Sequence, residues 1–230
     1  ANIKPHGKMK VSIVIPVSDD LRITQCIHSI DERVEVVISL NKATRKIREE
    51  IKKLLHSKKL SHLRIVTCEI SDASIAGAYN HGIETASHRL ILLMDSDCVF
   101  ESGCIRRLYQ NLDGNLLSKG RVVFTHNSFL SGVVARAREY HTSDKVSAFS
   151  PPLLFDKRIK KFIGNYFFHP QLCWLEDSEF DQRVQKAGLK ISYDASAKVF
   201  HPPLTPRRDL RSAFWYGVGK RIGVEIGVHE

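Results

Sequence analysis

The stretch LILLMDSDCVFESG, residues 90–103, decides the fold of this 230-residue chain. Its apolar run Leu90–Met94 has the length and composition of a buried strand. The run ends on two acids, Asp95 and Asp97, with Ser96 between them. Side chains at positions i and i+2 of an extended chain point to the same side, so both carboxylates can converge on one ligand. The stretch therefore predicts a strand that delivers two acids to a binding site.

Strands and helices alternate around this stretch. We expect strands at 10–17, 34–40, 63–68 and 89–94, and helices at 22–30, 43–56, 73–86 and 101–112. Apolar strands without a polar face indicate a parallel sheet that helices cover on both sides. In such sheets ligands bind beyond the carboxyl ends of the strands. The two acids lie at one of those ends.

The second half of the chain is less regular. We expect a strand at 121–126, a helix at 128–140, extended chain at 150–155, a helix at 177–189, short strands at 190–194 and 197–201, and a glycine-interrupted amphipathic segment at 206–227. The helix at 177–189 is the best signalled of these elements. Asp177 or Ser178 serves as its N-cap, and Gly188 follows its end.

The charge of the chain is strongly positive. Its 35 Lys and Arg residues against 25 Asp and Glu residues give a formal net charge of +10. Such a balance suits a polyanion, an anionic membrane surface or phosphorylated substrates, and it also fits a solvated basic face. The sequence contains no zinc-finger pattern and no RNP-like aromatic signature, so we expect no nucleic-acid partner.

Cysteine usage and hydropathy indicate a cytoplasmic protein. The five cysteines form no CxxC pair, which argues against a disulfide framework or a zinc knuckle and favours a reducing compartment. No apolar run approaches the roughly 20 residues of a membrane span. The first ten residues lack the apolar core of a signal peptide. Peripheral contact with the inner face of an anionic membrane remains an open alternative.

The acidic residues predict the chemistry. Two carboxylates of the kind that Asp95 and Asp97 offer suit Mg²⁺ or Mn²⁺, and such an ion assists the departure of a phosphate or diphosphate. Glu176 and Asp177 open a later helix, where an ionised carboxylate is favoured and can accept a proton from a hydroxyl. His201 is a candidate metal or phosphate ligand. The structural alternatives are a solvated turn at the two aspartates and an ordinary N-cap at Asp177.

Taken together and in order, these segments resemble the family 2 glycosyltransferases of GT-A fold. The resemblance rests on VSIVIPV (11–17), AGAYNHGIETASHRLILLMDSDC (76–98), PPLLFDKRIKKFIGNYFF (151–168), LEDSEFDQRVQKAGLKISYDASAKVFH (175–201) and FWYGVGKR (214–221). It implies one Rossmann-like α/β domain with a mostly parallel central sheet, helices on both faces and a smaller acceptor-side subregion. Residues 10–112 would bind the nucleotide sugar, residues 113–206 the acceptor, and residues 207–230 would form an amphipathic C-terminal segment.

The resemblance also implies a reaction. A sugar would move from a nucleoside-diphosphate sugar to an acceptor hydroxyl in one inverting, metal-dependent displacement. Asp177 would be the catalytic base with Glu176 beside it, and Asp97 would hold Mn²⁺ or Mg²⁺. His201 would help to bind the metal or the diphosphate. The acceptor would be a carbohydrate, a lipid-linked glycan or a small molecule.

The remaining implied positions concern the donor. Donor-binding roles would fall to Pro16, Val17, Asn41, Asn80, Asp95 and Ser96, and Arg183 matches a supporting motif position. The family often carries an acidic pair after its second strand, where this chain has Leu40 and Asn41. The side-chain amide of Asn41 can still hydrogen-bond a base. A UDP-sugar is therefore the default donor.

Two other functions stay open at this stage. A sugar-phosphate nucleotidyltransferase would share the fold, but the residues after the first strand lack its glycine-rich signature. A non-catalytic nucleotide- or partner-binding module is favoured by the altered residues after the second strand. The C-terminal segment places Leu210, Phe214, Val218 and Ile222 at spacing four, with basic residues beside them. That stripe would either dock on a membrane or pack on the domain's own core.

Overall fold

The computed structural model describes residues 9–71, 74–143 and 146–229. The strands are β1 Val11–Val17, β2 Glu35–Asn41, β3 Arg64–Ile70, β4 Leu90–Leu93, β5 Val99–Phe100, β6 Leu117–Phe124, β7 Leu153–Asp156 and β8 Ile191–His201. The helices are α1 Ile23–His28, α2 Arg45–Leu55, α3 Ile75–Thr85, α4 Cys104–Asn111, α5 Phe129–Ser143, α6 Glu176–Lys186 and α7 Pro206–Glu225, with short 3₁₀ turns at Lys58–Leu60 and Lys157–Lys161. Residue 73, the first of the helix expected at 73–86, lies outside the described residues.

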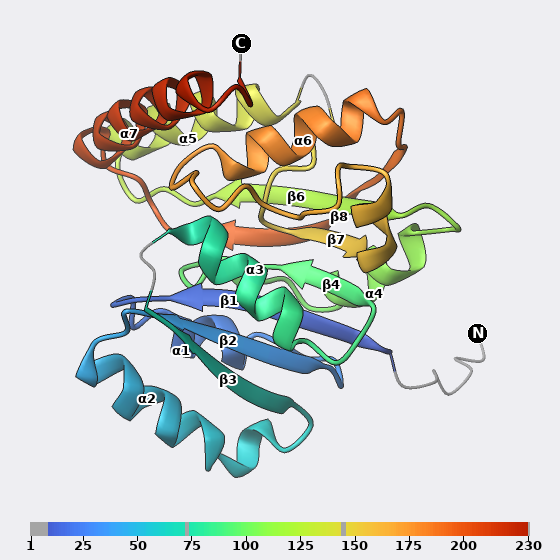
Figure 1. Cartoon of the computed structure of the whole chain (residues 1–230). Helices are drawn as coiled ribbons and strands as arrows, with labels where there is room; N and C mark the ends of the chain where they lie inside the picture. Colours follow the sequence, from blue (N-terminus) through green and yellow to red (C-terminus); the bar gives the residue numbers. More distant parts are fainter. Residues whose placement is uncertain (1–8, 72–73, 144–145, 230) are drawn as a thin grey trace.

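These strands form one sheet in the order β3-β2-β1-β4-β7-β6-β8-β5 (Figure 1). β1 pairs in parallel with β2 and β4, and β2 pairs in parallel with β3. β7 runs antiparallel between β4 and β6, β6 is parallel to β8, and β5 is antiparallel to β8. The expected α/β fold with a mostly parallel sheet is confirmed, and the same sheet runs through both halves of the chain.

Helices cover both faces of this sheet, as expected. On one face, α1, α2 and α4 pack against alternate residues of β1, and this core includes Ile13, Ile15, Ile27, Ile51 and Leu108. On the other face, which is the near side in Figure 1, α3 and α6 contribute to a second core that includes Val14, Tyr79, Ile83, Phe180 and Val184. Since β1 buries both of its faces, it reads in sequence as an apolar run that only Ser12 interrupts.

The strands expected at 190–194 and 197–201 are one strand, β8. Both parts pair with β6, and the register shifts between Lys119 and Arg121. A Cβ added to Gly120 would lie 2.2 Å from the carbonyl oxygen of Ala197, so glycine lets the two backbones approach at this irregularity. β6 itself begins at Leu117 rather than at residue 121. The short strand β5 was not expected from the sequence.

The C-terminal segment is a continuous helix, although we expected its glycines to interrupt it. α7 has 20 residues and begins at Pro206, with the side chain of Thr205 as its N-cap. Gly219 and Gly223 are buried, and a Cβ added to Gly219 would lie 2.6 Å from the carbonyl oxygen of Trp174. Tertiary packing therefore outweighs the low helix propensity of glycine.

In the described parts of the chain, no helix combines the length and the apolar composition that a membrane crossing requires.

We predict opposite effects for two alanine substitutions in α7. Gly219→Ala lowers the free energy of unfolding by about 1–3 kcal/mol, because the new methyl group collides with the backbone at Trp174. Gly217→Ala raises the free energy by about 0.5–1 kcal/mol, because its site is open and alanine favours the helix. Urea unfolding of both variants provides the measurement. Equal effects of the two substitutions would contradict this packing.

Candidate active site

A cavity of about 860 Å³ lies beyond the carboxyl ends of β1 and β4. Helices α5 and α7 contribute to its wall through Ala137, Ser212 and Tyr216. Six of the ten site positions expected from the sequence line it, namely Pro16, Asp95, Ser96, Asp97, Asp177 and His201. The structure thus brings residues from four distant segments of the chain to one cleft.

Asp97 and His201 lie next to each other in the lining of this cleft. The Nε2 atom of His201 lies 3.6 Å from Oδ2 of Asp97. One possible ligand atom from each of Asp97, Cys98 and His201 lies within 4.8 Å of the other two, and for Cys98 this atom is Sγ. Burial and the charges of Asp95 and Asp97 raise the pKa of Cys98 above its ordinary range, so its thiol stays protonated. Asp97 and His201 are therefore the better pair of metal ligands.

The tautomer of His201 favours this role. Its Nδ1 atom lies 2.8 Å from the carbonyl oxygen of Pro202, and a carbonyl oxygen can only accept a hydrogen bond. Nδ1 therefore carries the proton, and the lone pair of Nε2 faces Asp97. The backbone N–H and the hydroxyl of Thr125 both donate to the carbonyl oxygen of His201, each at 2.9 Å, and hold this residue in place. A fixed tautomer is typical of a metal-binding histidine.

Asp97 also has a cationic neighbour, Arg22. The guanidinium of Arg22 forms a two-pronged ion pair with Asp20 and lies 3.3 Å from Oδ2 of Asp97. The hydrogen bond to Asp20 raises the pKa of Arg22 above its ordinary value. Arg22 thus places a positive charge beside the carboxylate of Asp97.

Asp95 occupies a different environment from Asp97. Its Oδ1 atom accepts a hydrogen bond of 2.8 Å from the hydroxyl of Tyr79. Burial and the nearby charge of Asp97 raise the pKa of Asp95 to about 6, although the Tyr79 hydrogen bond lowers it. Burial also keeps the Tyr79 hydroxyl protonated by raising its pKa well above 10. Tyr79 therefore acts as a permanent hydrogen-bond donor that orients this carboxylate.

Asp177 lies in the first turn of α6, as expected, but it is not the N-cap. That position belongs to Leu175, whose left-handed backbone (φ 63°) is uncommon for a leucine. The Oδ1 atom of Asp177 accepts a hydrogen bond of 2.8 Å from the N–H of Ser178. Burial raises the pKa of Asp177 to about 6, and the Ser178 bond and the charge of Lys119 oppose this rise. Strained backbone next to a shifted acid is typical of functional sites.

Glu176 and Lys119 complete the charges around Asp177. Burial and the charge of Asp177 raise the pKa of Glu176 to about 8, so this side chain is mostly protonated at neutral pH. Lys119 comes from β6, lines the cavity, and donates a hydrogen bond of 2.8 Å from Nζ to the carbonyl oxygen of Pro151. Burial lowers the pKa of Lys119 to about 8, and the charges of Asp177 and Asp95 act in the opposite direction.

Four expected positions do not line the cavity: Glu176, Val17, Asn41 and Asn80. Val17 is buried in the core. The side-chain amide of Asn80 forms two hydrogen bonds with the backbone of Phe168. Its Nδ2 atom donates to the carbonyl oxygen of Phe168 at 2.8 Å, and its Oδ1 atom accepts from the N–H of Phe168 at 3.1 Å. Asn41 donates weakly to the carbonyl oxygen of Ser74 at 3.4 Å, and its buried Oδ1 atom has no hydrogen-bond partner among the described residues.

Arg183 stabilises the wall of the site. It forms two hydrogen bonds of 2.6 Å with the carboxylate of Glu179, which is 3% exposed. Its remaining N–H groups donate to the backbone carbonyl oxygens of Ile163, Tyr166 and Phe167. Arg183 therefore ties the segment around residue 165 to α6, nearly two turns after Asp177.

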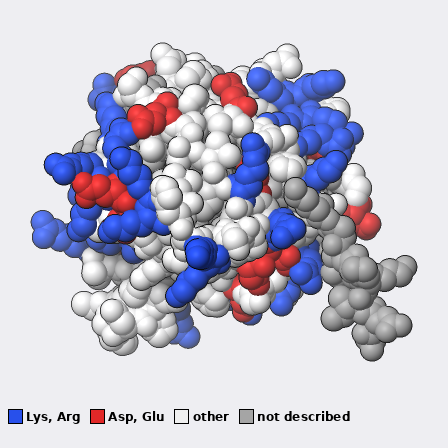
Figure 2. Space-filling view, turned by 90° about the horizontal axis from the view of Figure 1, so that it is seen from below, with Lys and Arg blue, Asp and Glu red and all other residues white. Residues whose placement is uncertain are grey.

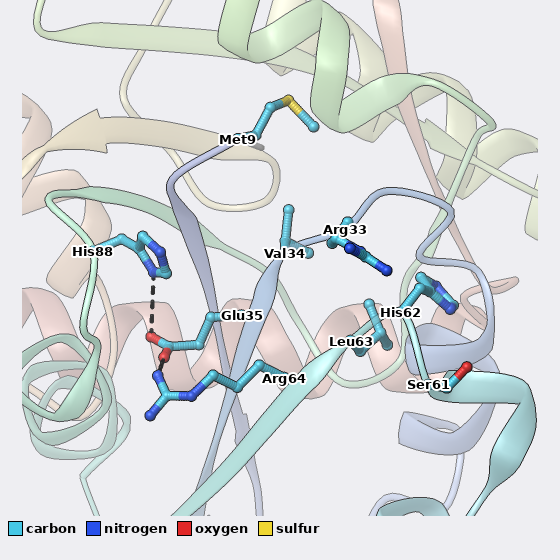
Figure 3. Close-up of a pocket in the computed structure, with 9 residues that line it drawn as sticks. All are labelled: Met9, Arg33, Val34, Glu35, Ser61, His62, Leu63, Arg64 and His88. Carbon is cyan, nitrogen blue, oxygen red and sulfur yellow. Dashed lines mark hydrogen bonds and ion pairs between the residues drawn. The ribbon is translucent and has the colours of Figure 1, made fainter. Parts of the chain in front are cut away.

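A smaller cavity of about 200 Å³ lies at the amino ends of β1, β2 and β3, opposite the carboxyl ends that face the large cavity (Figure 3). Its buried acid, Glu35, interacts with Arg64 and His88 and accepts hydrogen bonds from Ser12 and Ser87. Burial raises the pKa of Glu35, but these hydrogen bonds and the charge of Arg64 together lower it by more. The pKa of Glu35 therefore lies below its ordinary value. Both carboxylate oxygens of Glu35 have hydrogen-bond partners, so a structural role accounts for this cluster.

Comparisons with known proteins agree with this arrangement. The family model described as glycosyl transferase family 2 matches residues 12–180. The chain belongs to this family. The predicted resemblance and the predicted enzyme class, a glycosyltransferase, are thereby confirmed. No curated protein sequence matches the chain significantly.

Solved structures of Staphylococcus aureus TarS share the fold. The structure of TarS 1–349 has 16% identity and a TM-score of 0.66, and the match covers 95% of this chain and 65% of that chain. The same region in complex with UDP-GlcNAc gives the same identity and TM-score and is covered to 66%. A longer TarS structure is covered to 40%, with a TM-score of 0.65. This chain therefore spans about two thirds or less of the TarS chains that it resembles.

We predict that Arg183→Met destabilises the protein more than most single substitutions. The free energy of unfolding falls by about 3–5 kcal/mol, because Glu179 is left as a buried charge without its partner. Adding Glu179→Gln to the same chain restores part of the loss, since the buried charge is then removed. Urea unfolding of the single and double variants measures the difference. A double variant that is less stable than Arg183→Met would show that the ion pair has another role.

Proposed function

We propose that the chain transfers a sugar from a nucleoside-diphosphate sugar to an acceptor hydroxyl, with inversion and with a divalent metal. The observation that supports this most is the shared cavity. Asp97 and His201 lie at one part of its lining, and Asp177 lies at another. A metal-binding pair and a base with a pKa near neutrality are the two groups that such a displacement needs.

The donor set fits Mn²⁺ or Mg²⁺. Asp97 offers a carboxylate, and His201 offers an Nε2 lone pair that its Nδ1 hydrogen bond directs toward Asp97. An imidazole beside a carboxylate favours Mn²⁺ over Mg²⁺, which prefers oxygen ligands. When bound, the metal supplies positive charge that neutralises the departing diphosphate. Arg22 lies beside Asp97 and would contribute a fixed positive charge to the same leaving group.

Asp177 is the proposed base. With a pKa of about 6 it is mostly ionised at neutral pH, and it is still basic enough to accept a proton from a hydroxyl as the bond to the sugar forms. The acceptor oxygen attacks the anomeric carbon, the bond from that carbon to the diphosphate breaks, and the proton goes to Asp177. Glu176, whose raised pKa leaves it mostly protonated, adds little negative charge beside the base.

Donor recognition follows the ends of the first strands. Asp95 is proposed to bind the ribose or diphosphate side of the donor, with Pro16 and Ser96 next to it in the cavity lining. Asn41 is proposed to read the base, because its side-chain amide can pair with a base such as uracil; its Oδ1 atom is buried outside the cavity, so this role requires a local rearrangement that exposes it. A UDP-sugar is the donor this supports. The TarS complex with UDP-GlcNAc is a precedent in the same fold.

The acceptor is proposed to enter beside α7. Trp174 stacks on Trp215 with the ring planes 10° apart and meets Tyr216 edge to face. Trp174 and Tyr216 line the cavity together with Asp177. Aromatic rings with apolar faces next to the base suit a carbohydrate acceptor, whose hydroxyl must reach Asp177.

Two substitutions separate catalysis from donor binding. Asp177→Asn is expected to lower kcat by about 10²–10⁴-fold, because it removes the base. It keeps the stabilisation by UDP and Mn²⁺, which is about 2.7 kcal/mol at 100 times the dissociation constant. Asp97→Ala is expected to lose that stabilisation. Transfer assays and thermal unfolding with UDP and Mn²⁺ provide the measurements.

The matched control is Asp113→Asn, the same chemical change at an exposed turn. It is expected to alter neither readout. Near-normal transfer by Asp177→Asn would contradict the role of the base. A wild-type protein that neither binds nucleotides nor turns over donors would favour a non-catalytic module instead, and release of pyrophosphate from a nucleoside triphosphate would favour a nucleotidyltransferase.

The pH profile tests the environment of the base. The base must be ionised, and its pKa is about 6, so kcat/KM should fall about tenfold per pH unit below that value. Lys119→Met removes a cation that holds this pKa down, so the acid limb should move to higher pH. Lys190→Met, at an exposed lysine, is the control and should leave the limb unchanged. An unmoved limb in Lys119→Met would rule out the influence of this lysine on Asp177.

A further inference from the structure

Exposed apolar side chains concentrate on two neighbouring helices, α5 and α7. Among the described residues, twelve large apolar side chains are exposed. Seven of them lie on these helices, which contribute 15 and 20 residues to the chain: Phe129, Leu130, Val133, Leu210, Phe214, Tyr216 and Val224. Scattered exposed apolar residues are normal, but a concentration of this kind marks an interaction surface.

Three apolar residues of α7 share its outer side, whereas Val218 and Ile222 of the expected stripe are half-buried. Leu210, Phe214 and Val224 are 71%, 66% and 50% exposed, and their spacing along the helix places them on one stripe. The opposite side carries the buried Gly219 and Gly223. The hypothesis that this stripe packs on the domain's own core is therefore wrong for Leu210 and Phe214.

α5 extends the same surface. Its first turns expose Phe129, Leu130 and Val133 at 84%, 60% and 52%. Arg138 holds it to α7 through an ion pair of 2.7 Å with Asp209 and a hydrogen bond of 3.0 Å to the hydroxyl of Tyr216. Figure 1 shows the two helices side by side at one end of the molecule. We call the exposed sides of α5 and α7 the α5–α7 face.

The α5–α7 face is basic as well as apolar. α7 has five basic residues, all exposed, against two acidic ones, which gives a net charge of +3: Arg207, Arg208, Arg211, Lys220 and Arg221 against Asp209 and Glu225. Figure 2 shows the opposite end of the molecule, where Lys and Arg are also numerous. There α2 carries the same net charge of +3, but its apolar residues Ile47, Ile51 and Leu54 are buried, so basic charge and an exposed apolar stripe coincide on α7 and not on α2.

We propose that the α5–α7 face docks on an anionic lipid surface. Aromatic and aliphatic side chains between arginines and lysines are the pattern of a helix that lies in a membrane interface. Each basic residue near such a surface adds electrostatic attraction. Two helices of the face also contribute Ala137, Ser212 and Ala213 to the wall of the cavity. Docking therefore places the cavity beside the lipid headgroups.

This placement extends the proposed function and rests on it. An acceptor anchored in the membrane presents its hydroxyl at the headgroup level, where the side of the cavity formed by α5 and α7 would meet it. The acceptor class that follows is a lipid-linked glycan or another lipid-anchored hydroxyl compound. A fully water-borne acceptor needs no apolar stripe beside the cleft.

Vesicle sedimentation tests the docking directly. The whole chain is mixed with extruded vesicles of phosphatidylcholine, with or without phosphatidylglycerol, at low and high salt. We expect the protein to pellet with the phosphatidylglycerol vesicles at low salt and to dissociate at high salt, because the charges are then screened. Leu210→Ser/Phe214→Ser is expected to weaken the partition about tenfold or more, since two apolar side chains no longer insert.

Leu55→Ser/Phe162→Ser is the matched control, because it makes the same kind of change at exposed residues outside the face. It should bind vesicles as the wild type does. Stabilisation by UDP and Mn²⁺, measured on every variant, reports folding and donor binding independently of lipid.

Two sedimentation results would overturn the docking: a wild type that does not pellet with anionic vesicles, or an equal loss of vesicle binding in both double variants. A third would be a wild type that does not bind vesicles and forms a dimer that Leu210→Ser/Phe214→Ser dissociates. If any of these occurs while UDP and Mn²⁺ still stabilise the protein, the docking fails and the proposed function stands. If the protein sediments with anionic vesicles but UDP and Mn²⁺ do not stabilise it, the docking stands and the proposed function fails.

Discussion

The placement of three carboxylates in one cleft is the constraint around which this structure is organised. Asp95, Asp97 and Asp177 line that cleft. Burial is the largest cause that raises the pKa of Asp95 and Asp177, and the charge of a neighbouring aspartate adds to each rise. The protein offsets this cost with cations from other elements. Arg22 follows β1 and reaches Asp97, while Lys119 enters from β6 between the two halves of the sheet. Lys119 lowers the pKa of both Asp95 and Asp177, so it helps to keep these two acids ionised at neutral pH.

The mixed sheet makes this convergence possible. β1 and β4 run in parallel, so their carboxyl ends and the acids after β4 share one edge. β7 reverses direction next to β4, and β6 and β8 then bring Lys119 and His201 to the same cleft. The antiparallel strand thus joins the half that is proposed to bind the donor to a second half that supplies Lys119, Asp177 and His201. A purely parallel sheet would have needed a further crossover for each of them.

The sequence was informative where local pattern and tertiary role agree. Apolar runs without alternation predicted the buried strands, and the abrupt change from Met94 to Asp95 marked the cleft. The contributions of Lys119, Tyr79 and Arg22 were missed because each depends on a contact between distant segments. Tyr79 stands directly before the motif residue Asn80, so it was near a signal. Asn80 itself turned out to bond the backbone of Phe168, a role that no local pattern contains.

The C-terminal helix α7 shows why helix propensity did not predict a continuous helix, and what its glycines contribute to the packing. Glycines at 219 and 223 weaken an isolated helix, yet they let α7 approach Trp174, three residues before the proposed base. The inner side of α7 therefore sets the position of the segment that leads into Leu175 and Asp177. Its outer side carries the exposed stripe of the α5–α7 face. One helix thus contacts, on its inner side, the segment that leads into the proposed base and carries, on its outer side, the surface proposed to meet the lipid.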